Sequence, residues 1–218
     1  MKLLVATRSP GKAREFRELF AGLPFAIEFP ADRFLERLPD EADLERESSY
    51  TENAVAKVRY FAQRSGLPTL ADDSGLEVDA LGAAPGIHSA RWAGEAAGEG
   101  RRGGGPRAAG TGDLDARNNA LLLERLAGVP ETQRTARYRC VVAYLETPAG
   151  VPEIVEAGCE GFILSAPRGA GGFGYDPLFF SADLRMSFGE APSAAKHRVS
   201  HRGRACRALI EVLLRRVK

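Results

Sequence analysis

Cysteine is scarce in this chain. Among 218 residues there are three, Cys140, Cys159 and Cys206. Their number is odd, they lie far apart in the sequence, and they lack metal-ligand spacing, so neither a disulfide framework nor a cysteine metal site is indicated. We therefore expect three reduced thiols, as is usual for a protein of the cytosol.

Long apolar runs are also missing. No stretch approaches the roughly 18 residues of a membrane-spanning helix, and the N-terminus shows no secretory signal, so we expect a cytoplasmic protein with no membrane partner. Neither sign of charge is in excess, since 30 Lys and Arg stand against 29 Asp and Glu for a formal net charge of +1. This balance gives no global attraction to nucleic acid, so any phosphate affinity must be local.

The first candidate site lies near the N-terminus, where the pattern predicts a strand over 2–6, a loop and an amphipathic helix. Ser9 suits the N-cap and Pro10 the first helical position. Such a loop presents free N–H groups and the positive end of the helix dipole, which favours phosphate, although the spacing of a P-loop is absent. Many α/β proteins begin with a capped strand-helix unit that binds nothing. The candidate phosphate contacts are Thr7, Arg8, Ser9, Pro10, Gly11 and Lys12.

Two adjacent carboxylates, Asp72 and Asp73, follow an apolar run at 68–71. We expect the strand to stop there, Ser74-Gly75 to turn the backbone, and a second, half-buried strand to start at Leu76. Neighbouring carboxylates repel unless they share a cation or a proton, which favours a Mg²⁺ or Mn²⁺ site with one carboxylate orienting or deprotonating a water. A solvated turn is the alternative, because these residue types favour turns.

A glycine-rich segment at 169–176 precedes a predicted strand at 177–180. Its glycines permit close approach of the backbone to a ligand, and Phe173 and Tyr175 offer faces for stacking a base. A glycine-rich turn with no ligand is the alternative interpretation.

The densest basic cluster runs from Lys196 to Arg204, immediately before a predicted helix. Ser200 suits the cap, which places His201 and Arg202 at the positive end of that helix. Cations at this end are unfavourable, and an anionic ligand would relieve the repulsion. A solvated basic surface is the alternative.

The remaining pattern is that of an α/β protein. A helix capped by Ser49 or Thr51 should stop at Gly66, and long strands are expected over 136–145 and 153–164 with a hairpin turn between them. From Gly94 to Gly112 the chain is rich in glycine and arginine, which predicts a flexible surface loop. An arginine-glycine arm for RNA is the alternative, although the interleaved aromatics of such arms are absent.

Four features now stand together: a capped loop with a lysine, an acidic metal-type turn, an aromatic glycine segment and a basic helix start. Together they suit the phosphates, the divalent cation and the base of a nucleoside triphosphate. Hydrolysis by a metal-oriented water fits better than kinase chemistry. The chain also resembles the inosine triphosphate pyrophosphatase family, also called non-canonical purine NTP pyrophosphatases or dITP/XTP diphosphatases. The resemblance rests on Leu4–Thr7 with Gly11-Lys12, Tyr50–Ala54 with Lys57, Leu67–Ala80, Pro85-Gly86, Ser89–Arg91, Gly171–Pro177, Lys196 and Ser200–Gly203.

The resemblance implies one domain over 1–218, with an elongated mixed β-sheet, flanking helices and two lobes around a central substrate cleft, usually as a homodimer. It implies Mg²⁺-dependent hydrolysis of ITP, dITP and XTP to the monophosphate and pyrophosphate. Asp73 matches the general base and metal aspartate, with Asp72 beside it. The matching substrate contacts are Thr7, Arg8, Ser9, Pro10, Gly11, Lys12, Ser74, Phe173, Gly174, Tyr175, Asp176, Lys196, His201 and Arg202.

Two positions depart from the family pattern. Ser9 stands where an asparagine is usual, which keeps a cap but shortens its reach. The second metal carboxylate lies before Tyr50, where we choose Glu45, with Leu44 and Glu47 as alternatives. To reject adenine, the site must offer donors to the O6 atom of the base, and we expect His201 and Arg202 to supply them.

Three other functions fit parts of the pattern. A Maf-type pyrophosphatase would act on other modified nucleotides, and a sugar-phosphate phosphatase would release orthophosphate. A non-enzymatic RNA-binding module would bind oligonucleotides with a steep dependence on salt.

Overall fold

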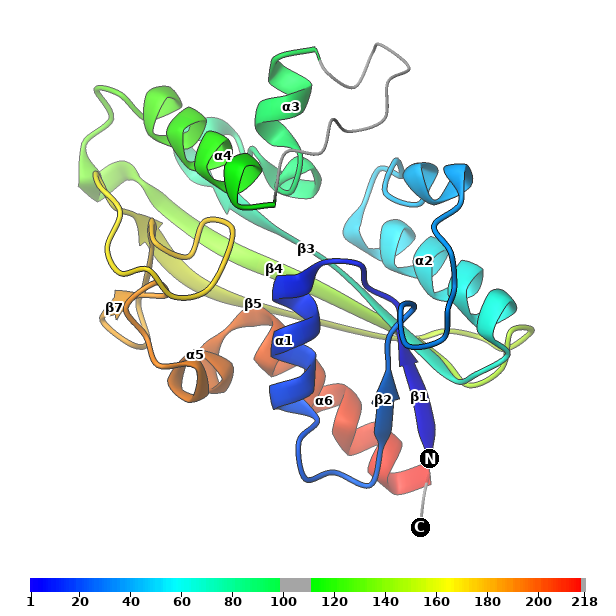
Figure 1. Ribbon diagram of the computed structural model, residues 1–218. Helices are drawn as coiled ribbons and strands as arrows, with labels where there is room; N and C mark the ends of the chain where they lie inside the picture. Colours follow the sequence, from blue (N-terminus) through cyan, green and yellow to red (C-terminus); the bar gives the residue numbers. More distant parts are fainter. Residues whose placement is uncertain (99–110, 217–218) are drawn as a thin grey trace. The chain divides into compact units, whose positions relative to one another are not determined.

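A computed structural model describes residues 1–98 and 111–216 (Figure 1). These residues form a mixed sheet whose strands are hydrogen-bonded in the order β2-β1-β3-β4-β5-β6-β7. The strands are β1 (Lys2–Val5), β2 (Ala26–Glu28), β3 (Thr69–Val78), β4 (Thr135–Leu145), β5 (Glu153–Ile163), β6 (Phe179–Ser181) and β7 (Met186–Ser187). The helices are α1 (Pro10–Leu19), α2 (Tyr50–Ser65), α3 (Trp92–Ala96), α4 (Thr111–Arg125), α5 (Ser193–Val199) and α6 (His201–Arg216). The mixed sheet with flanking helices confirms the predicted fold class.

The described chain divides into two compact units. The first contains Met1–Asp73, Cys140–Ala157 and the chain from His201, and the second contains Ser74–Arg139 and Gly158–Ser200 as far as they are described. The predicted cleft between two lobes stays a prediction, as does the single-domain organisation.

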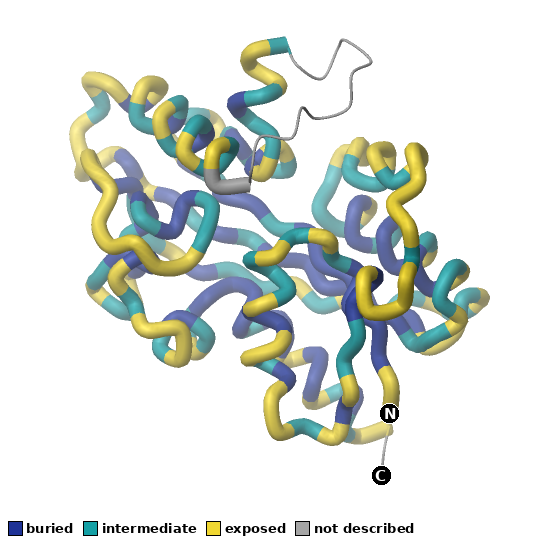
Figure 2. Tube along the Cα trace, viewed as in Figure 1, coloured by how far each residue is buried: buried dark blue, intermediate teal, exposed yellow. Residues whose placement is uncertain are grey.

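The first unit is a three-layer arrangement. β1 pairs in parallel with both β2 and β3. Successive residues of a strand point to opposite faces, so Leu3 and Val5 pack with α1 and α6, whereas Leu4 packs with α2. β1 is therefore covered by helices on both faces and is buried except at Lys2, whereas the edge strand β2 is exposed or half-buried (Figure 2).

The connections of β1 create a switch point in this unit. The chain leaves β1 through α1 to reach β2, and it reaches β3, on the other side of β1, through α2. In open α/β sheets, ligands bind outside the carboxyl ends of the strands where the connections diverge in this way. The loop after β1 and the acidic pair in β3 lie at this place.

The second unit has a core of its own. Its apolar side chains come from the strands of this unit, from α4, and from the segment that carries Tyr175 and Leu178. Tyr138, Phe179 and Phe188 form an aromatic group, with ring centroids between 4.7 and 6.1 Å apart. The segment around Tyr175 is thus fixed to a rigid core.

Local signals predicted several element ends correctly. Ser9 caps α1 and Pro10 begins it, Ser49 caps α2, and Gly66 ends α2 in a left-handed conformation. Two long strands, β4 and β5, lie where they were expected.

Two expectations need correction. The chain does not turn at Ser74-Gly75, because β3 runs unbroken from Thr69 to Val78 with the acidic pair inside it. The expected loop over 94–112 is shorter at both ends, since α3 extends to Ala96 and α4 begins at Thr111. Residues 99–110 lie outside the described part of the chain.

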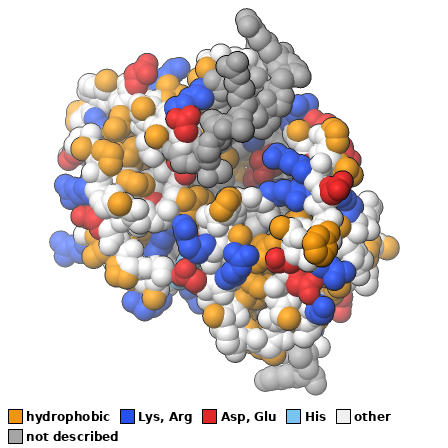
Figure 3. Space-filling model, viewed as in Figure 1, with side chains coloured by type: hydrophobic (Ala, Val, Ile, Leu, Met, Phe, Trp, Pro, Cys, Tyr) orange, Lys and Arg blue, Asp and Glu red, His pale blue; other side chains and the backbone are white. Residues whose placement is uncertain are grey.

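None of the helices described has the length and apolar character that a membrane span requires. On the face drawn in Figure 3, acidic and basic side chains are interspersed.

Candidate active site

The loop between β1 and α1 has the geometry expected of an anion site. The hydroxyl of Ser9 accepts a hydrogen bond from the N–H of Lys12 (3.3 Å), and the hydroxyl of Thr7 accepts one from the N–H of Ser9 (3.1 Å). These bonds fix the loop and direct the start of α1, where the helix dipole is positive. A pocket of about 310 Å³ adjoins it, lined by Thr7, Arg8, Ser9, Pro10, Ala13, Arg17 and Phe29–Asp32.

Arg8 is held by the protein rather than left pointing outward. Its guanidinium donates to both carboxylate oxygens of Glu41 (2.7 Å each) and to the carbonyl of Leu35 (2.9 Å). Arg64 of α2 donates to the same Glu41 carboxylate (2.8 Å). Burial acts to raise the pKa of Glu41, but Arg8 and Arg64 outweigh it and lower that pKa. Arg8 therefore ties the loop between β1 and α1 to the acidic segment before α2.

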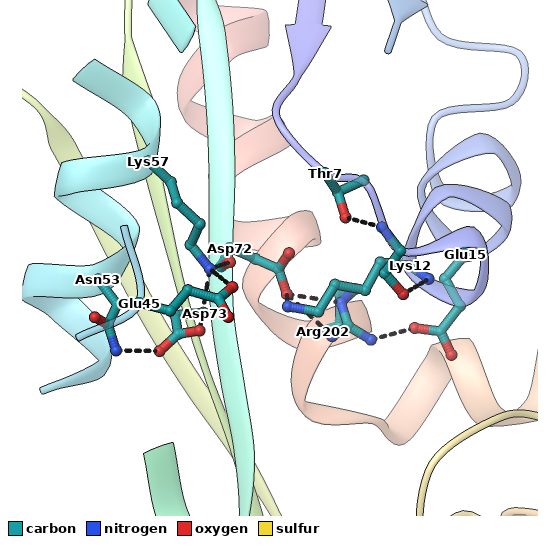
Figure 4. Close-up of polar contacts among 10 residues, drawn as sticks. Thr7, Lys12, Glu15, Glu45, Asn53, Lys57, Asp72, Asp73 and Arg202 are labelled. Atoms are coloured by element: carbon teal, nitrogen blue, oxygen red, sulfur yellow. Dashed lines mark hydrogen bonds and ion pairs between the residues drawn. The ribbon is translucent and has the colours of Figure 1, made fainter. Parts of the chain in front are cut away.

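Asp72 and Asp73 point to opposite faces of β3 (Figure 4). This follows from the continuous strand, because the side-chain period of a strand is two residues. Asp73 faces α2, and Asp72 faces α1 and α6. The two carboxylates therefore do not share one cation, as the predicted turn would have allowed.

On the face of β3 that α2 covers, Lys57 binds the carboxylates of both Asp73 and Glu45. Its ammonium lies 3.0 Å from a carboxylate oxygen of Asp73, 3.0 Å from one of Glu45 and 2.6 Å from the carbonyl oxygen of Asp72. Burial acts to lower the pKa of Lys57, but Glu45 and Asp73 outweigh it and raise that pKa. The second carboxylate oxygen of Asp73 accepts from the side-chain amide of Asn53 (3.0 Å). Asp73 is thus held at both oxygens.

On the other face, Asp72 holds two cations. One of its oxygens lies 3.0 Å from the ammonium of Lys12 and accepts from two nitrogens of Arg202 (3.1 and 3.0 Å). Arg202 also donates to the carboxylate of Glu15 on α1. Burial acts to raise the pKa of Asp72, but Lys12 and Arg202 outweigh it and hold that pKa well below its ordinary value. Arg202 is only 2 % exposed, so this network is internal.

At the start of α6 we predicted an anion that offsets the basic side chains. Carboxylates of the chain itself supply that negative charge. Asp72 and Glu15 neutralise Arg202, which lies at the second position of the helix. His201 is buried beside it at 4 % exposure. Whether either side chain contacts a base stays a prediction.

Sequence reasoning missed two members of these networks. Asn53 precedes Lys57 by four residues on α2, and Glu15 follows Lys12 by three on α1. Residues at these spacings share a helix face, so a signal was present for both. Glu15 is 5 % exposed, and a buried carboxylate is rare unless it is paired.

Two carboxylates, Asp73 and Glu45, are the candidate ligands of a metal ion. No group of three or more His, Cys, Asp or Glu side chains within residues 1–98 and 111–216 is arranged to hold one. Each of the two carboxylates has an oxygen 3.0 Å from the ammonium of Lys57, which lies between them. Mg²⁺ is commonly bound by one or two carboxylates together with substrate phosphates and waters. This donor set fits Mg²⁺ on those terms.

In the second unit, the segment predicted to recognise a base forms a tight turn. One carboxylate oxygen of Asp176 accepts from the N–H of Phe173 (2.8 Å) and from the ammonium of Lys196 (2.5 Å). That ammonium also lies 5.3 Å from the ring centre of Phe173. Gly172 has φ +75°, and a Cβ there would lie 2.0 Å from the Asp176 carboxylate. Only glycine fits at position 172 while Asp176 keeps this place.

Tyr175 does not present its ring as expected. The ring is 3 % exposed in the core of the second unit, and its hydroxyl donates to the carbonyl of Ser89 (2.9 Å). Burial raises the pKa of Tyr175. The stacking prediction now rests on Phe173, which is partly exposed, as is Ser74 in β3.

With this geometry established, the chain can be compared with known proteins. The model of the Ham1 family matches residues 3–212. The chain belongs to the Ham1 family. A dITP/XTP pyrophosphatase of Geobacter sulfurreducens is 44 % identical over 205 residues, covering 94 % of this chain and 92 % of the relative.

Further relatives extend the match to the ends of the chain. A dITP/XTP pyrophosphatase of Thioalkalivibrio sulfidiphilus is 44 % identical over 216 residues, or 98 % of each chain. The solved structure of a HAM1 protein from Coxiella burnetii has a TM-score of 0.78 and 32 % identity, and the match covers 99 % of each chain. The resemblance found in the motifs therefore extends over the whole fold.

Proposed function

We propose that this protein hydrolyses non-canonical purine nucleoside triphosphates, namely ITP, dITP and XTP, to the monophosphate and pyrophosphate. The names of its relatives support this activity, since a dITP/XTP pyrophosphatase matches at 44 % identity over nearly all of both chains. Of the structural observations, the one that carries the proposal is the separation of Asp72 from Asp73. It places Asp73 with Lys57 and Asn53 on one face of β3, where we assign the reaction, and Asp72 with Lys12 and Arg202 on the other.

Asp73 is the general base of the proposed reaction. A water attacks the α-phosphorus, its proton passes to the Asp73 carboxylate, and the bond from the α-phosphorus to the bridging oxygen breaks to release pyrophosphate. Lys57 and Asn53 hold the two oxygens of Asp73 in place, so the base is oriented before substrate arrives.

Mg²⁺, or Mn²⁺ in its place, would be held by Asp73 and Glu45 together with phosphate oxygens of the substrate. When bound, such an ion neutralises charge on the phosphates and supplies a more acidic water. Lys12 and the N–H groups at the start of α1 bind the phosphates, and Asp72 keeps Lys12 in position through their 3.0 Å ion pair.

The turn from Phe173 to Asp176 recognises the base, with the partly exposed ring of Phe173 as the stacking surface. His201 and Arg202 are proposed as donors to O6. An adenine carries an amino group at that position, so a donor would face a donor, which is unfavourable. A homodimer in the cytoplasm is the proposed biological form.

The test is pyrophosphate release from ITP, XTP, GTP and ATP, with and without Mg²⁺. We expect turnover of ITP and XTP that depends on Mg²⁺ and falls by about 10²–10⁴-fold in Asp73→Asn, the range for removal of a general base. Asp43→Asn, an exposed carboxylate outside these networks, is the matched control. Release of orthophosphate, or equal turnover of ATP and ITP, would contradict the proposal.

A further inference from the structure

Helix α4 contacts the base-recognition turn through two side chains that bind one residue. The carboxylate of Asp115 accepts a hydrogen bond from the N–H of Gly174 (2.8 Å), and the side-chain amide of Asn119 donates to the carbonyl of Gly174 (2.9 Å). Asp115 and Asn119 are four residues apart on α4 and therefore share a face. One helix face thus binds both polar groups of a single glycine, 59 and 55 residues away in the sequence.

Gly174 is a residue that needs such support. Its φ is +61°, and no atom lies within 4 Å of where a Cβ would be. Glycine has the widest choice of backbone conformations. Side-chain hydrogen bonds to its N–H and its carbonyl therefore restrict the peptide groups on both sides of it. These peptide groups carry Phe173 on one side and Tyr175 on the other.

The residue before Asn119 contacts the same region. Asn118, 1 % exposed, donates to the carbonyl of Ser89 (3.3 Å) and accepts from the N–H of Ala93 (2.8 Å). The Ser89 carbonyl also accepts from the hydroxyl of Tyr175. Two successive residues of α4 thus bind the turn, one directly at Gly174 and one through the partner of Tyr175.

Within the described part of the chain, Asn119 donates one hydrogen bond and leaves its other polar atom unsatisfied. Its side-chain oxygen is buried and has no hydrogen-bond partner among the residues that the structure describes. A buried acceptor left in this state is destabilising, so an apolar residue would suit a purely structural helix better. The hydrogen bond to Gly174 is what the amide provides.

We propose that Asp115 and Asn119 are positioning residues that hold the Phe173–Asp176 turn in the conformation that accepts the base. The proposal rests on the proposed function, because that function assigns base recognition to this turn. The proposed role of the pair concerns the base, not the phosphates or the reacting water. The pair sets the affinity for the nucleoside part of the substrate through Gly174.

The experiment measures KM for ITP and the inhibition constants of inosine monophosphate and of pyrophosphate. In Asp115→Ala and Asn119→Ala we expect KM and the inhibition constant of the monophosphate to rise by roughly tenfold, the size of one lost hydrogen bond. The inhibition constant of pyrophosphate, which has no base, should stay within about twofold of wild type. Glu124→Ala, exposed on the same helix, is the control.

Isosteric variants separate the hydrogen bonds from the packing. Asp115→Asn keeps an acceptor for the Gly174 N–H and should retain most of the affinity, whereas Asn119→Asp keeps the size of the side chain but loses the donor and should behave like Asn119→Ala. If an alanine variant does not fold, these two variants carry the test.

Two outcomes would overturn the positioning role. Either the constants for monophosphate and pyrophosphate rise together, which indicates general damage, or neither changes in the alanine and aspartate variants. A wild-type protein that neither releases pyrophosphate from ITP nor binds inosine monophosphate would instead remove the proposed function, and the role of the pair with it.

Discussion

Asp72 and Asp73 are adjacent in the sequence, yet each binds a different lysine on a different face of β3 (Figure 4). Lys12 of α1 pairs with Asp72, and Lys57 of α2 pairs with Asp73. The strand keeps the two carboxylates apart because successive side chains of a strand point to opposite faces. A doublet that suggests a shared metal site is therefore two carboxylates with different ion-pair partners.

Replacing Asp72 with Asn should destabilise the fold without removing a reacting group. Lys12 and Arg202 would be left without their shared carboxylate, and breaking a buried pair costs about 3–5 kcal/mol. Urea unfolding at pH 7 measures the loss, with the exposed Asp43→Asn as control. A loss below about 1 kcal/mol, the usual value for surface pairs, would contradict an internal network.

The same variant should change the dependence of stability on pH. Lys12 and Arg202, acting against burial, hold the pKa of Asp72 well below its ordinary value. A group whose pKa is lower in the folded state contributes stability above its unfolded pKa, about 3.9, and loses it as the pH falls towards the folded value. The stability difference between wild type and Asp72→Asn should be constant from about pH 5 to 8 and shrink below about pH 4. A difference that persists unchanged at pH 2.5 would contradict this assignment.

The metal carboxylate before α2 can be identified by comparing Glu45→Gln with Glu47→Gln. Glu45 reaches the ammonium of Lys57 at 3.0 Å together with Asp73, whereas Glu47 donates its backbone N–H to the side chain of Asn53. We expect the Mg²⁺ concentration for half-maximal activity to rise at least about tenfold in Glu45→Gln, the lower end of the effect of outer-shell partners. Glu47→Gln should match wild type, and the reverse order would move the site to Glu47.

The predictable part of this structure is the part that local signals determine. Ser9, Ser49 and Gly66 mark helix ends because capping involves residues within one turn of the chain. The continuous strand at Ser74-Gly75 was missed because turn preferences are weak and the neighbouring strands of a sheet override them.

The charge networks lay beyond such reasoning. Arg202 is 130 residues from Asp72 and 187 from Glu15 in the sequence. Which acidic side chain pairs with which basic side chain depends on the strand order and on the faces that α1 and α6 cover. Asp72 and Arg202 were identified as candidates from their residue types, but their ion pair was not.

The three cysteines should be inert in the native protein. All are buried, and burial raises the pKa of Cys140 to about 12 and raises that of Cys206. Because the thiolate is the reactive form, a thiol reagent at pH 8 should modify none of them before the protein unfolds and all three afterwards. Rapid modification of the folded protein would show that the cores around these cysteines open readily.

Arg202→Ala tests whether the buried guanidinium also serves base selectivity. The variant leaves Asp72 and Glu15 without their partner, so the fraction of folded enzyme will fall. The ratio of kcat/KM for ITP to that for ATP is insensitive to this fraction, because both substrates meet the same active molecules. If Arg202 donates to O6, the ratio should fall by about ten- to a hundredfold, as expected for loss of a hydrogen bond from a charged donor. An unchanged ratio would limit Arg202 to holding Asp72, and the same measurement on His201→Ala would then decide whether the neighbouring side chain supplies the donor.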